Sequence, residues 1–458
     1  AEVIPEGWFQ SFPVDDDPVH PTYYEETLTS GMNSEDNNFG NYQLAKKTGT
    51  KFHDRNADGD RDDGEEGLAG WTIFVDYDGD GVNDPEEPSA VTISGGSYLI
   101  EGIEPGTWMV REVMSDHTGW MQSYPGAPDY YHEDTFTSGE TERGNDFGNY
   151  TYASKSGYKF HDIDADGVWD VVDPENQTSE DEPGLQGWTI YVDVDGSGTF
   201  NAGDLWDVTD ENGFYKIENI MPGVEYTIRE VLKTNWIQSF PAEGFYTETF
   251  ESTVESTRND FGNYQYATKS GYKWHDLNAD GIWQKTGDGA EPGLAGWKIF
   301  IDEDSDLEWD ATEVYVMTTA GGFYIFEDLE PGEYVFAEVI PTGWFQSFPG
   351  TPEIPEVHEE TLTSGMVSED NNFGNWMPAS KTGVKFHDLN GDGVKDTGEP
   401  GLAGWTIYVD VDGDGYDAED PQAVTITGGG YTITGIKPGV YDVFERMDNQ
   451  DPAWIQSL

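Results

Sequence analysis

The chain has 458 residues, which is too long for one hydrophobic core and predicts about three to four domains. Its 91 acidic and 22 basic residues give a net charge of −69, which argues against a nucleic-acid partner because such partners require basic patches. Aromatic residues make up 14% of the chain, so the acidity does not indicate disorder. No apolar stretch approaches the roughly 18 residues of a membrane span. Cysteine is absent, so bound metal rather than disulfide bonds is expected to stabilise a secreted fold.

A repeated unit organises the sequence. The tetrapeptide K-[FW]-H-D begins at Lys51, Lys159, Lys273 and Lys385, at spacings of 108, 114 and 112 residues. The tripeptide F-G-N recurs with the same spacings, at Phe39, Phe147, Phe261 and Phe373. The expected domains are an N-terminal segment (1–45), repeat 1 (46–153), repeat 2 (154–267), repeat 3 (268–379) and an incomplete repeat 4 (380–458). Such a period suits a string of sandwich domains rather than a solenoid.

The predicted elements are strands, which repeat 1 illustrates in chain order. After K-F-H-D and an acidic loop, residues 71–75 are β-branched and aromatic and are bounded by Gly70 and Asp76. A second acidic loop precedes a strand at 98–103, and a Pro-Gly turn precedes the alternating segment 107–113. No segment keeps a helical period. Turn signals about every 8–12 residues predict an all-β tandem array of roughly seven-stranded, immunoglobulin-like or prealbumin-like β-sandwiches. Very short linkers predict stiff coupling between neighbours.

The segment after each K-[FW]-H-D matches the calcium-loop pattern D-x-[DN]-x-[DN]-G-x5-E. In repeat 1, oxygen-bearing side chains occupy positions 1, 3, 5, 9 and 12, Gly59 lies at the sharp turn, and Asp60 offers its carbonyl at position 7. A second such loop follows the 71–75 strand. The pattern predicts Ca²⁺, up to two ions per repeat, because this hard ion takes about six to eight oxygens, whereas Mg²⁺ rejects large all-protein cages.

The predicted metal ligands can be grouped by loop. Those of the first loops are Asp54, Asn56, Asp58, Asp60, Asp62 and Glu65; Asp162, Asp164, Asp166, Val168, Asp170 and Asp173; Asp276, Asn278, Asp280, Ile282 and Asp288; and Asp388, Asn390, Asp392, Val394, Asp396 and Glu399. Those of the second loops are Asp76, Asp78, Asp80, Val82, Asp84 and Glu87; Asp193, Asp195, Ser197, Thr199, Asn201 and Asp204; Asp302, Asp304, Asp306, Glu308, Asp310 and Glu313; and Asp410, Asp412, Asp414, Tyr416 and Asp420. Four loops depart from the pattern. In the first loop of repeat 2, Asp170 leads into an insertion, with Asp173 at position 12, and in the first loop of repeat 3, Asp288 or Glu291 must close the loop. In the second loops of repeats 3 and 4, Leu307 replaces the glycine and Ala418 occupies position 9.

The run KFHDLNGDGVKDTGEPGLAGWTIYVDVDGDG, followed by GGGYTITGIKPGVYDVFE, resembles the SdrD B-like repeats of bacterial serine-aspartate-repeat surface adhesins. That family belongs to the collagen-adhesin B-type, transthyretin-like sandwiches. The resemblance covers nearly the whole chain. It implies calcium-rigidified, non-catalytic stalk domains on a cell exterior, and it identifies no ligand.

Related sandwiches can carry an internal Lys–Asn isopeptide bond assisted by a glutamate. The residues that match these roles are Lys51, Lys159, Lys273 and Lys385; Glu112, Glu230 and Glu338; and Asn145, Asn259 and Asn372. Strand alternation places Phe52, Tyr158 and Val384 on the core face, which predicts that these lysines point outward. Surface ion pairing is therefore their expected role.

Three other residue sets receive structural interpretations. The histidines before the first loops, His53, His161, His275 and His387, are expected to be hydrogen-bonded strand-end residues. The G-W tryptophans, Trp71, Trp188, Trp297 and Trp405, are expected in the core, and only exposed ones could stack on sugars. Asn149 and Asn176 begin sequons and are candidate N-glycosylation sites. No catalytic motif appears, so the chain is not expected to be an enzyme.

The expected function is that of a structural subunit of an extracellular filament or surface layer. The alternatives are the stalk of a cell-surface adhesin and a carbohydrate-binding accessory module. The chain opens inside a structural motif, as a mature form or a fragment would. Segment 1–45 contains E-E-T-L-T-S and N-N-F-G-N-Y, the kind of strands that follow W-x-Q-S in repeats 1 to 3. The expected partner is therefore another copy, with 1–45 completing 380–458 head to tail, unless a neighbouring repeat does so in cis.

Overall fold

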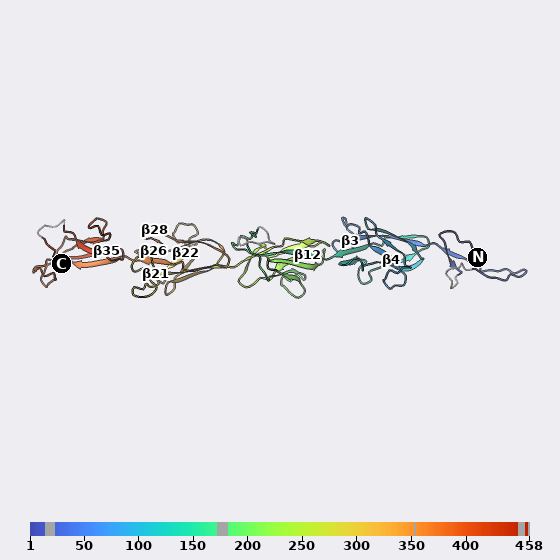
Figure 1. The fold of residues 1–458 in the computed structure, drawn as a ribbon, viewed down its shortest axis with the longest axis horizontal. Helices are drawn as coiled ribbons and strands as arrows, with labels where there is room; N and C mark the ends of the chain where they lie inside the picture. The colour runs from blue at the N-terminus through green and yellow to red at the C-terminus, as the bar shows by residue number, and fades with distance from the viewer. Residues whose placement is uncertain (14–22, 172–181, 352–353, 448–453, 457–458) are drawn as a thin grey trace. The chain divides into compact units, whose positions relative to one another are not determined.

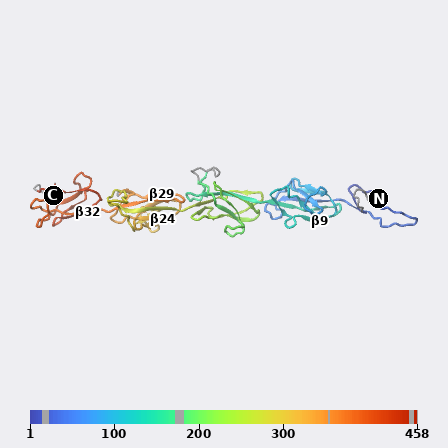
Figure 2. The same ribbon diagram turned by 60° about the horizontal axis from the view of Figure 1, so that its bottom comes forward.

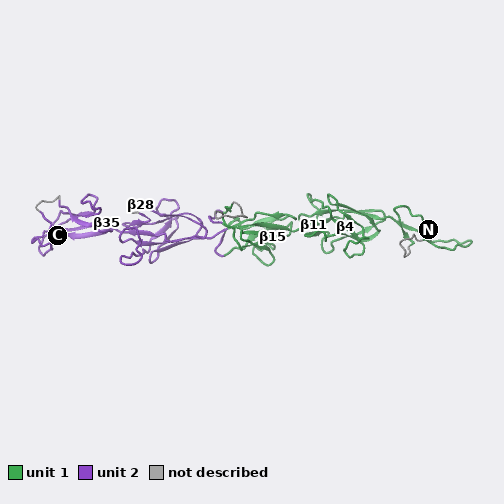
Figure 3. Cartoon of the chain, viewed as in Figure 1, with its two compact units in different colours: residues 1–161, 167–233, 238–262 green, residues 162–166, 234–237, 263–458 purple. Residues whose placement is uncertain are grey.

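The computed structural model describes residues 1–13, 23–171, 182–351, 354–447 and 454–456, in which every regular element is a β-strand. None of these residues forms a helix able to cross a membrane. The chain divides into two compact units (Figure 3): unit 1 comprises residues 1–161, 167–233 and 238–262, and unit 2 comprises 162–166, 234–237 and 263–458. The predicted all-β class is confirmed, and the strands form repeated sandwich-like sets.

Repeat 1 has nine strands in two sheets, more than the roughly seven expected, because β5 and β10 are three-residue edge strands. The strands are β3 (Ala45–His53), β4 (Thr72–Asp76), β5 (Ser89–Val91), β6 (Ser97–Ile103), β7 (Gly106–Glu112), β8 (Trp120–Tyr124), β9 (His132–Phe136), β10 (Thr141–Arg143) and β11 (Phe147–Thr151). One sheet has the order β10-β3-β11-β8, with β6 also paired to β3, and the other has the order β5-β4-β7-β9. Figure 1 labels β3 and β4, and Figure 2 labels β9.

The long strand β3 ties the first sheet together. Its first half pairs antiparallel with β6 and parallel with β10. Its second half, Lys51–His53, pairs parallel with Phe147–Asn149 of β11, which in turn pairs antiparallel with β8. The first and last strands of the repeat therefore run side by side in the same direction.

The core of repeat 1 lies between the two sheets and follows the predicted alternation. On β6, Tyr98 and Ile100 are buried, whereas Leu99 between them is exposed. They pack in one cluster with Ile73 of β4 and Phe147 of β11. Each such buried side chain contributes about 1.5–3 kcal/mol relative to its exposed state. This cluster fixes the strand ends at which the acidic loops begin.

Repeats 2 and 3 have the same two-sheet plan. Repeat 2 contains β12 (Ala153–His161), β13 (Thr189–Asp193), β14 (Leu205–Val208), β15 (Phe214–Ile220), β16 (Glu225–Glu230), β17 (Ile237–Phe240), β18 (Tyr246–Thr249), β19 (Glu255–Ser256) and β20 (Phe261–Tyr264). Repeat 3 contains β21 (Ala267–His275), β22 (Lys298–Ile301), β23 (Tyr315–Met317), β24 (Phe323–Leu329), β25 (Gly332–Glu338), β26 (Phe345–Phe348), β27 (Gly350–Thr351), β28 (Ile354–Pro355), β29 (His358–Leu362), β30 (Val367–Ser368) and β31 (Phe373–Trp376). Their main sheets have the orders β15-β12-β20-β17 and β24-β21-β31-β26.

Repeat 4 and the N-terminal segment hold smaller sheets. Repeat 4 contains β32 (Ala379–Val384), β33 (Thr406–Asp410), β34 (Gln422–Val424), β35 (Gly430–Ile436) and β36 (Asp442–Glu445). Within the described residues, β32 pairs only with β35, and the other three strands form the sheet β34-β33-β36. In the N-terminal segment, β1 (Phe9–Phe12) pairs with β2 (Gly40–Tyr42) and places Asn41 opposite Gln10. The β8–β11 pair of repeat 1 has the same register, with Asn149 opposite Gln122.

Candidate metal loops and the buried lysine cluster

Seven of the eight acidic loops begin at the end of a strand, which fixes the position of their first carboxylate, whereas Asp388 in repeat 4 lies four residues beyond the end of β32. Asp54 follows β3, and Asp76 ends β4. Their Oδ2 atoms accept hydrogen bonds from the amides at position 6, at 2.8 Å from Gly59 N and 3.1 Å from Gly81 N. Gly59 has a φ of 87°, the left-handed conformation that glycine adopts without Cβ strain. The sharp turn predicted at position 6 is therefore present.

An acid closes each loop by holding both of its ends. In repeat 1, Glu65 Oε1 accepts the N–H of Arg55 at 2.7 Å, and Glu65 Oε2 accepts the N–H of Asp62 at 3.1 Å. Burial raises the pKa of Glu65. The same pair of bonds is made by Glu87, Asp204, Glu313 and Glu399. Positions 2, 9 and 12 thus meet as the sequence pattern requires.

Carboxylates converge in several loops of the described chain. Sets with one oxygen each within 4.8 Å of one another are Asp76, Asp78 and Asp80; Asp162, Asp164 and Asp166; Asp193, Asp195 and Asp204; Asp302, Asp304 and Asp306; and Asp410, Asp412 and Asp414. The neighbouring Asp412 raises the pKa of Asp414. Burial, and then Asp306, raises the pKa of Asp304. Like-charge repulsion contributes to both pKa shifts, and a bound cation would remove it.

The first loops of repeats 1, 3 and 4 carry asparagine at position 3. Asn56 Nδ2 donates to Asp58 at 2.8 Å and to Asp62 at 3.1 Å. The amide NH₂ group thus stabilises the two carboxylates by donating hydrogen bonds to them. If the amide were rotated by 180°, its oxygen would take that place and could coordinate a cation. Asp54 is fully buried, and within the described residues its Oδ1 atom has no hydrogen-bond partner. A buried carboxylate oxygen without a partner is costly in a folded protein, and a bound cation would satisfy it.

In two first loops the acid that holds the end of the loop lies beyond position 12: Glu182, which was not predicted, in repeat 2, and Glu291, one of the two predicted alternatives, in repeat 3. In repeat 2, Glu182 accepts the N–H of Asp170 at 3.2 Å, and the predicted Asp173 lies outside the described residues. In repeat 3, the two oxygens of Glu291 accept N–H groups at 2.7 and 3.0 Å, whereas Asp288 is exposed. Both glutamates lie two residues before a G-L dipeptide, as in repeats 1 and 4. Counting back from that dipeptide would have identified them despite the altered loop lengths.

The second loops of repeats 3 and 4 keep the loop shape with altered sequences. In repeat 4, Asp420 accepts the N–H groups of Val411 and Asp417, each at 3.2 Å. Asp417, rather than Ala418, therefore takes the place of position 9, because this loop is one residue shorter than predicted. In repeat 3, Leu307 adopts a φ of 63°, and its N–H still reaches the first carboxylate at 3.1 Å. The left-handed conformation costs a residue with a Cβ about 1–2 kcal/mol.

The prediction that the K-[FW]-H-D lysines point outward is wrong. Lys51 is fully buried, as are Lys159 and Lys273. Alternation fails because Lys51, Phe52 and His53 are buried in succession, so this end of β3 is covered on both faces. Lys51 Nζ lies 4.5 Å from the ring centroid of Trp71, whose indole shields the amine from water.

Lys51 faces a glutamate and an asparagine inside the sandwich. Its Nζ atom lies 3.3 Å from Glu112 Oε2, contacts Asn149 Oδ1 and donates to the carbonyl of Phe147 at 3.2 Å. The corresponding residues are Lys273, Glu338 and Asn375 in repeat 3, and Lys159, Glu230 and Asn263 in repeat 2. In repeat 4, Lys385 pairs with Glu445 at 2.5 Å. We call this set the lysine cluster.

The surroundings of the lysine cluster favour neutral forms. Burial lowers the pKa of Lys51 from 10.5 to about 8, although Glu112 opposes this shift. Burial also raises the pKa of Glu112. A neutral amine is a nucleophile, a protonated carboxyl can carry a proton, and an amide carbon next to both can be attacked. The arrangement therefore has the groups required for amide exchange between Lys51 and Asn149.

The asparagines predicted for this cluster lie elsewhere. Asn145 Nδ2 contacts Asp134, which lies 2.7 Å from the buried Lys47. In repeat 2, Asn259 lies 3.4 Å from Glu248, the partner of Lys155, and in repeat 3 Asn372 accepts the N–H of Tyr272 at 2.9 Å. The asparagine of F-G-N is the residue that faces the lysine. Each complete repeat thus has a second buried lysine, on the same strand, that pairs with an acid of the other sheet.

The remaining residue predictions have mixed outcomes. His53 is hydrogen bonded as expected, with Nδ1 at 3.2 Å from Glu66 and Nε2 at 2.9 Å from Ser252. The four G-W tryptophans are buried, which confirms their assignment to the core. Asn149 is also fully buried, so its sequon is not accessible to a glycan, while Asn176 lies outside the described residues.

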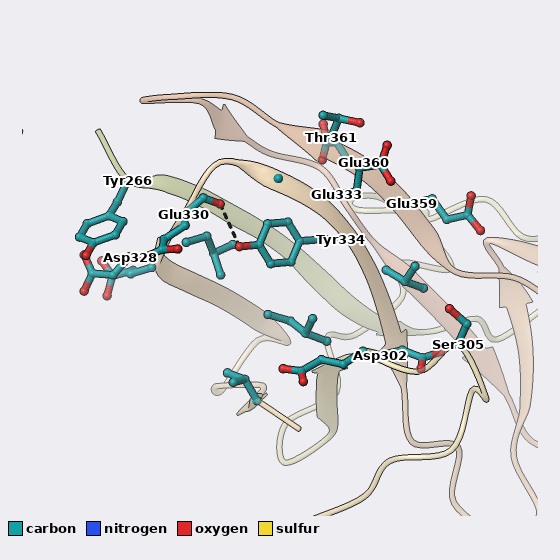
Figure 4. A pocket seen from close by; sticks show the side chains of 17 residues that line it. Tyr266, Asp302, Ser305, Asp328, Glu330, Glu333, Tyr334, Glu359, Glu360 and Thr361 are labelled. Atoms are coloured by element: carbon teal, nitrogen blue, oxygen red, sulfur yellow. Dashed lines mark hydrogen bonds between the residues drawn. The ribbon is translucent and has the colours of Figure 1, made fainter. Parts of the chain in front are cut away.

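An open groove of about 1010 Å³ in repeat 3 lies beside the second loop (Figure 4). Acidic side chains line it, among them Asp302, Glu330 and Glu359, and none of its lining residues in the described part of repeat 3 is a lysine, arginine or histidine. The hydroxyl of Tyr334 donates to the Glu330 carbonyl at 2.9 Å. The groove therefore suits cations rather than anionic ligands.

Comparison with known proteins places the chain among cell-surface proteins. No family model matches it. Serine-aspartate repeat-containing protein D of Staphylococcus aureus (strain Newman) is 26% identical over 431 residues, covering 89% of this chain and 31% of that relative. Serine-aspartate repeat-containing protein F of Staphylococcus epidermidis is 25% identical over 330 residues, covering 64% of this chain and 17% of that relative. The chain thus spans less than a third of either relative.

Solved pilin structures are also similar. The major pilin subunit BcpA of Bacillus cereus has 11% identity and a TM-score of 0.31, over 73% of this chain and 100% of that one. The major pilin SpaD from Corynebacterium diphtheriae has 12% identity and a TM-score of 0.24, over 73% and 97%. The resemblance drawn from the sequence is confirmed by the sequence relatives. The chain is homologous to serine-aspartate repeat-containing surface proteins, lies outside the cell and has a structural rather than an enzymatic role.

Proposed function

We propose that this chain is a calcium-stiffened structural subunit of an extracellular filament or surface layer whose copies join head to tail. The observation that carries the proposal is the recurrence, in all four repeats, of two acidic loops closed by an acid. The stalk of an adhesin whose binding tip lies in another domain is the second candidate, favoured by the homology to surface proteins. The burial of the G-W tryptophans removes the support for a carbohydrate-binding module.

The chemistry of the loops supports calcium as the cation. Each loop offers carboxylate and carbonyl oxygens from alternate positions, and none of its predicted ligands is a nitrogen or sulfur donor. Hard oxygen donors in a flexible loop suit Ca²⁺ better than Zn²⁺ or Mg²⁺. Two loops in each of four repeats give an expected maximum of eight ions. Neutralisation of these clusters would also relieve the repulsion implied by a net charge of −69.

Native mass spectrometry of the whole chain tests the ion content. We expect several Ca²⁺ ions per chain, which excess Mg²⁺ does not displace and a chelator removes. The matched variant Asp78→Ala should lose one ion, whereas Asp116→Ala, which changes an exposed aspartate outside the loops, should lose none. A chain that binds no calcium at millimolar concentration would contradict the proposal.

Strand complementation between copies is the proposed mode of assembly. The main-sheet strand of repeat 4, β32, is exposed along its length, and within the described residues it pairs only with β35. Segment 1–45 carries the β1–β2 pair, whose register matches that of β8–β11 in repeat 1. An open strand edge accepts an added strand, and a head-to-tail contact that does not close gives a filament. We therefore propose that β2 of one copy pairs with Lys385–His387 of the next, the segment that follows β32 and matches Lys51–His53 of β3.

Deletion of residues 1–45 tests this assembly. The truncated chain should retain folded repeats 1 to 3 by circular dichroism but should no longer form end-to-end polymers in negative-stain images. Adding the 1–45 peptide to the full chain should cap the polymers and shorten them. Filaments of the same width and repeat from the truncated chain would rule out strand complementation.

The lysine cluster adds a proposed covalent brace in repeats 1 to 3. Lys51 Nζ would attack Asn149 Cγ, forming a C–N bond while the bond to Nδ2 breaks and ammonia leaves. Glu112 would carry the proton from Nζ to the departing nitrogen. The contact between Lys51 and Asn149 favours this reaction over simple ion pairing. Intact-mass measurement should show a loss of about 17 Da per bond, the mass of one ammonia. Glu112→Gln should abolish the loss in repeat 1, and a full theoretical mass for the native chain would rule out the bond.

A further inference from the structure

Within unit 1, one serine of repeat 2 connects that repeat to the first loop of repeat 1. Ser252 is buried, and its N–H donates to the Arg55 carbonyl at 2.9 Å. Its Oγ atom accepts the N–H of Thr151 at 2.7 Å and lies 2.9 Å from His53 Nε2. Arg55 occupies position 2 of the first loop. Repeat 2 therefore holds the loop itself, and the connection is more than the covalent linker.

The same contact occurs in unit 2. The N–H of Ser364 in repeat 3 donates to the Ile163 carbonyl at 2.8 Å, and Ser364 Oγ accepts the N–H of Gln265 at 2.7 Å. Ile163 occupies position 2 of the first loop of repeat 2, as Arg55 does in repeat 1. We call the set of bonds made by this serine the serine clasp. Its recurrence with a different residue at position 2 shows that the backbone carbonyl, rather than the side chain, is what it recognises.

The closing acid of the first loop bonds the same residue, Arg55, as the serine clasp does. Glu65 Oε1 accepts the N–H of Arg55 at 2.7 Å, while the carbonyl of Arg55 accepts from Ser252. Next to Arg55, the carbonyl of Asn56 lies so close to Gly223 of repeat 2 that a Cβ there would be 2.0 Å away. By contrast, the hydrogen bonds that Asp76 and Glu87 make in the second loop stay within repeat 1.

We infer that the cation of the first loop holds its repeat rigidly against the following repeat at this contact, which we call the joint, whereas the cation of the second loop acts only within its own repeat. This inference rests on the calcium binding proposed above. An observation independent of the acidic pattern points to the ion: the Oδ1 atom of the fully buried Asp54 has no hydrogen-bond partner among the described residues. The ion holds the loop in the shape that presents the position-2 carbonyl. Without it, the carboxylates repel and the serine clasp opens.

Distance measurements across the joint test the inference in the full chain. Because the chain has no cysteine, Leu99→Cys in repeat 1 and Glu218→Cys in repeat 2 place two spin labels on exposed strand positions. Double electron–electron resonance should give a narrow distance distribution with calcium and a broad one with chelator. The matched variants are Asp58→Ala in the first loop and Asp80→Ala in the second, which remove exposed position-5 ligands. With calcium present, Asp58→Ala should broaden the distribution to the chelated width, and Asp80→Ala should leave it narrow.

A third variant separates the joint from the fold of repeat 1. Ser252→Pro, which removes the N–H that the Arg55 carbonyl accepts, should broaden the distribution while native mass spectrometry shows the same number of calcium ions as the parent chain. Equal broadening by Asp58→Ala and Asp80→Ala would overturn the inference, and so would an unchanged width in Ser252→Pro. If Asp58→Ala unfolds repeat 1, Ser252→Pro together with the chelated parent chain decides the question. Absence of calcium binding by the parent chain would instead overturn the proposed function, and the inference with it.

Discussion

Repeats 3 and 4 place nearly the same strand in different surroundings. β21 begins A-T-K-S-G-Y and β32 begins A-S-K-T-G-V. Lys269 is buried in β21, whereas the matching Lys381 is exposed on β32. β21 is flanked by β24, β30 and β31, whereas the described residues give β32 only β35. The exposure of this strand is therefore decided by its neighbours, and a lysine near its start is compatible with both states.

Among the changes that test this comparison, removal of calcium should have the largest effect on the stability of the repeats. We expect excess EDTA to lower the melting temperature of the whole chain by about 10 °C or more, because unneutralised carboxylates repel and ion binding no longer stabilises the folded state. Repeat 4 should melt first, since its buried cluster is limited to Ile407, Val409, Ile433 and Ile436. Differential scanning calorimetry in calcium and in EDTA measures both effects. Identical thermograms would contradict the calcium loops.

Truncation of a buried side chain on β31, a strand with no counterpart among the described residues of repeat 4, should have the next largest effect. Phe373 on β31 is fully buried in repeat 3, so Phe373→Ala should destabilise that repeat by about 3–5 kcal/mol. Phe444 on β36 of repeat 4 is 43% exposed, and Phe444→Ala is the matched control, with a loss below about 1 kcal/mol. Hydrogen exchange with peptide resolution reports each repeat separately. Equal losses in the two repeats would show that their cores do not differ as described.

The buried lysine of a complete repeat should give a pH dependence of stability. Asn149→Ala keeps Lys51 titratable by preventing amide formation. The pKa of Lys51 is about 8 in the folded chain and 10.5 in its ordinary state, so between these values the unfolded state binds more protons than the folded one. The stability of repeat 1 should therefore be constant with respect to this group below pH 8 and rise as the pH increases from 8 to 10.5, by at most about 3 kcal/mol.

The control for this titration is the double variant Lys51→Met, Asn149→Ala, whose stability should lack that rise. Urea unfolding at a series of pH values, followed by hydrogen exchange of repeat 1, gives the profile for both variants. A parallel rise in the control would assign the effect to other groups.

A residue swap at position 6 of the second loops should have the smallest effect. Leu307 of repeat 3 has a φ of 63°, and Gly415 of repeat 4 has a φ of 101°. Leu307→Gly should stabilise repeat 3 by about 1 kcal/mol, since it relieves the left-handed strain. Gly415→Leu should destabilise repeat 4 by a similar amount. Chemical denaturation of the two variants in calcium provides the measurement, and effects of the same sign would show that φ does not govern this position.

The repeats, the strands and the loops were predictable because each follows a local pattern. Alternation on β6 and the recurring K-[FW]-H-D and F-G-N signals required no tertiary information. The burial of Lys51 was not predictable from alternation, because β3 changes partners along its length and its end is covered on both faces. A usable signal was present. In a chain with 22 basic residues, every repeat places two lysines four residues apart on this strand.

The closing acids illustrate a different reason for error. In repeat 2 the closing acid was predicted at Asp173 by counting forward from the first aspartate, and in repeat 3 the same count left Asp288 and Glu291 as alternatives, because loop length varies between repeats. The backbone requires only that the acid reach the N–H groups at both ends of the loop, which Glu291 does at 2.7 and 3.0 Å. Spacing from the strand that follows is therefore more reliable than spacing from the strand that precedes.

The parallel pairing of β3 with β11 determines how a repeat responds to tension. The chain enters repeat 1 at the start of β3 and leaves it at the end of β11, and Lys51–His53 runs beside Phe147–Asn149 in the same direction. A pull on the two ends loads these strands in shear, so their interstrand hydrogen bonds must break together rather than one after another. The covalent brace proposed between Lys51 and Asn149 would lie within this same sheared segment. Forced extension is governed by the unfolding barrier, and this strand order raises that barrier along the direction in which a surface-anchored chain is pulled.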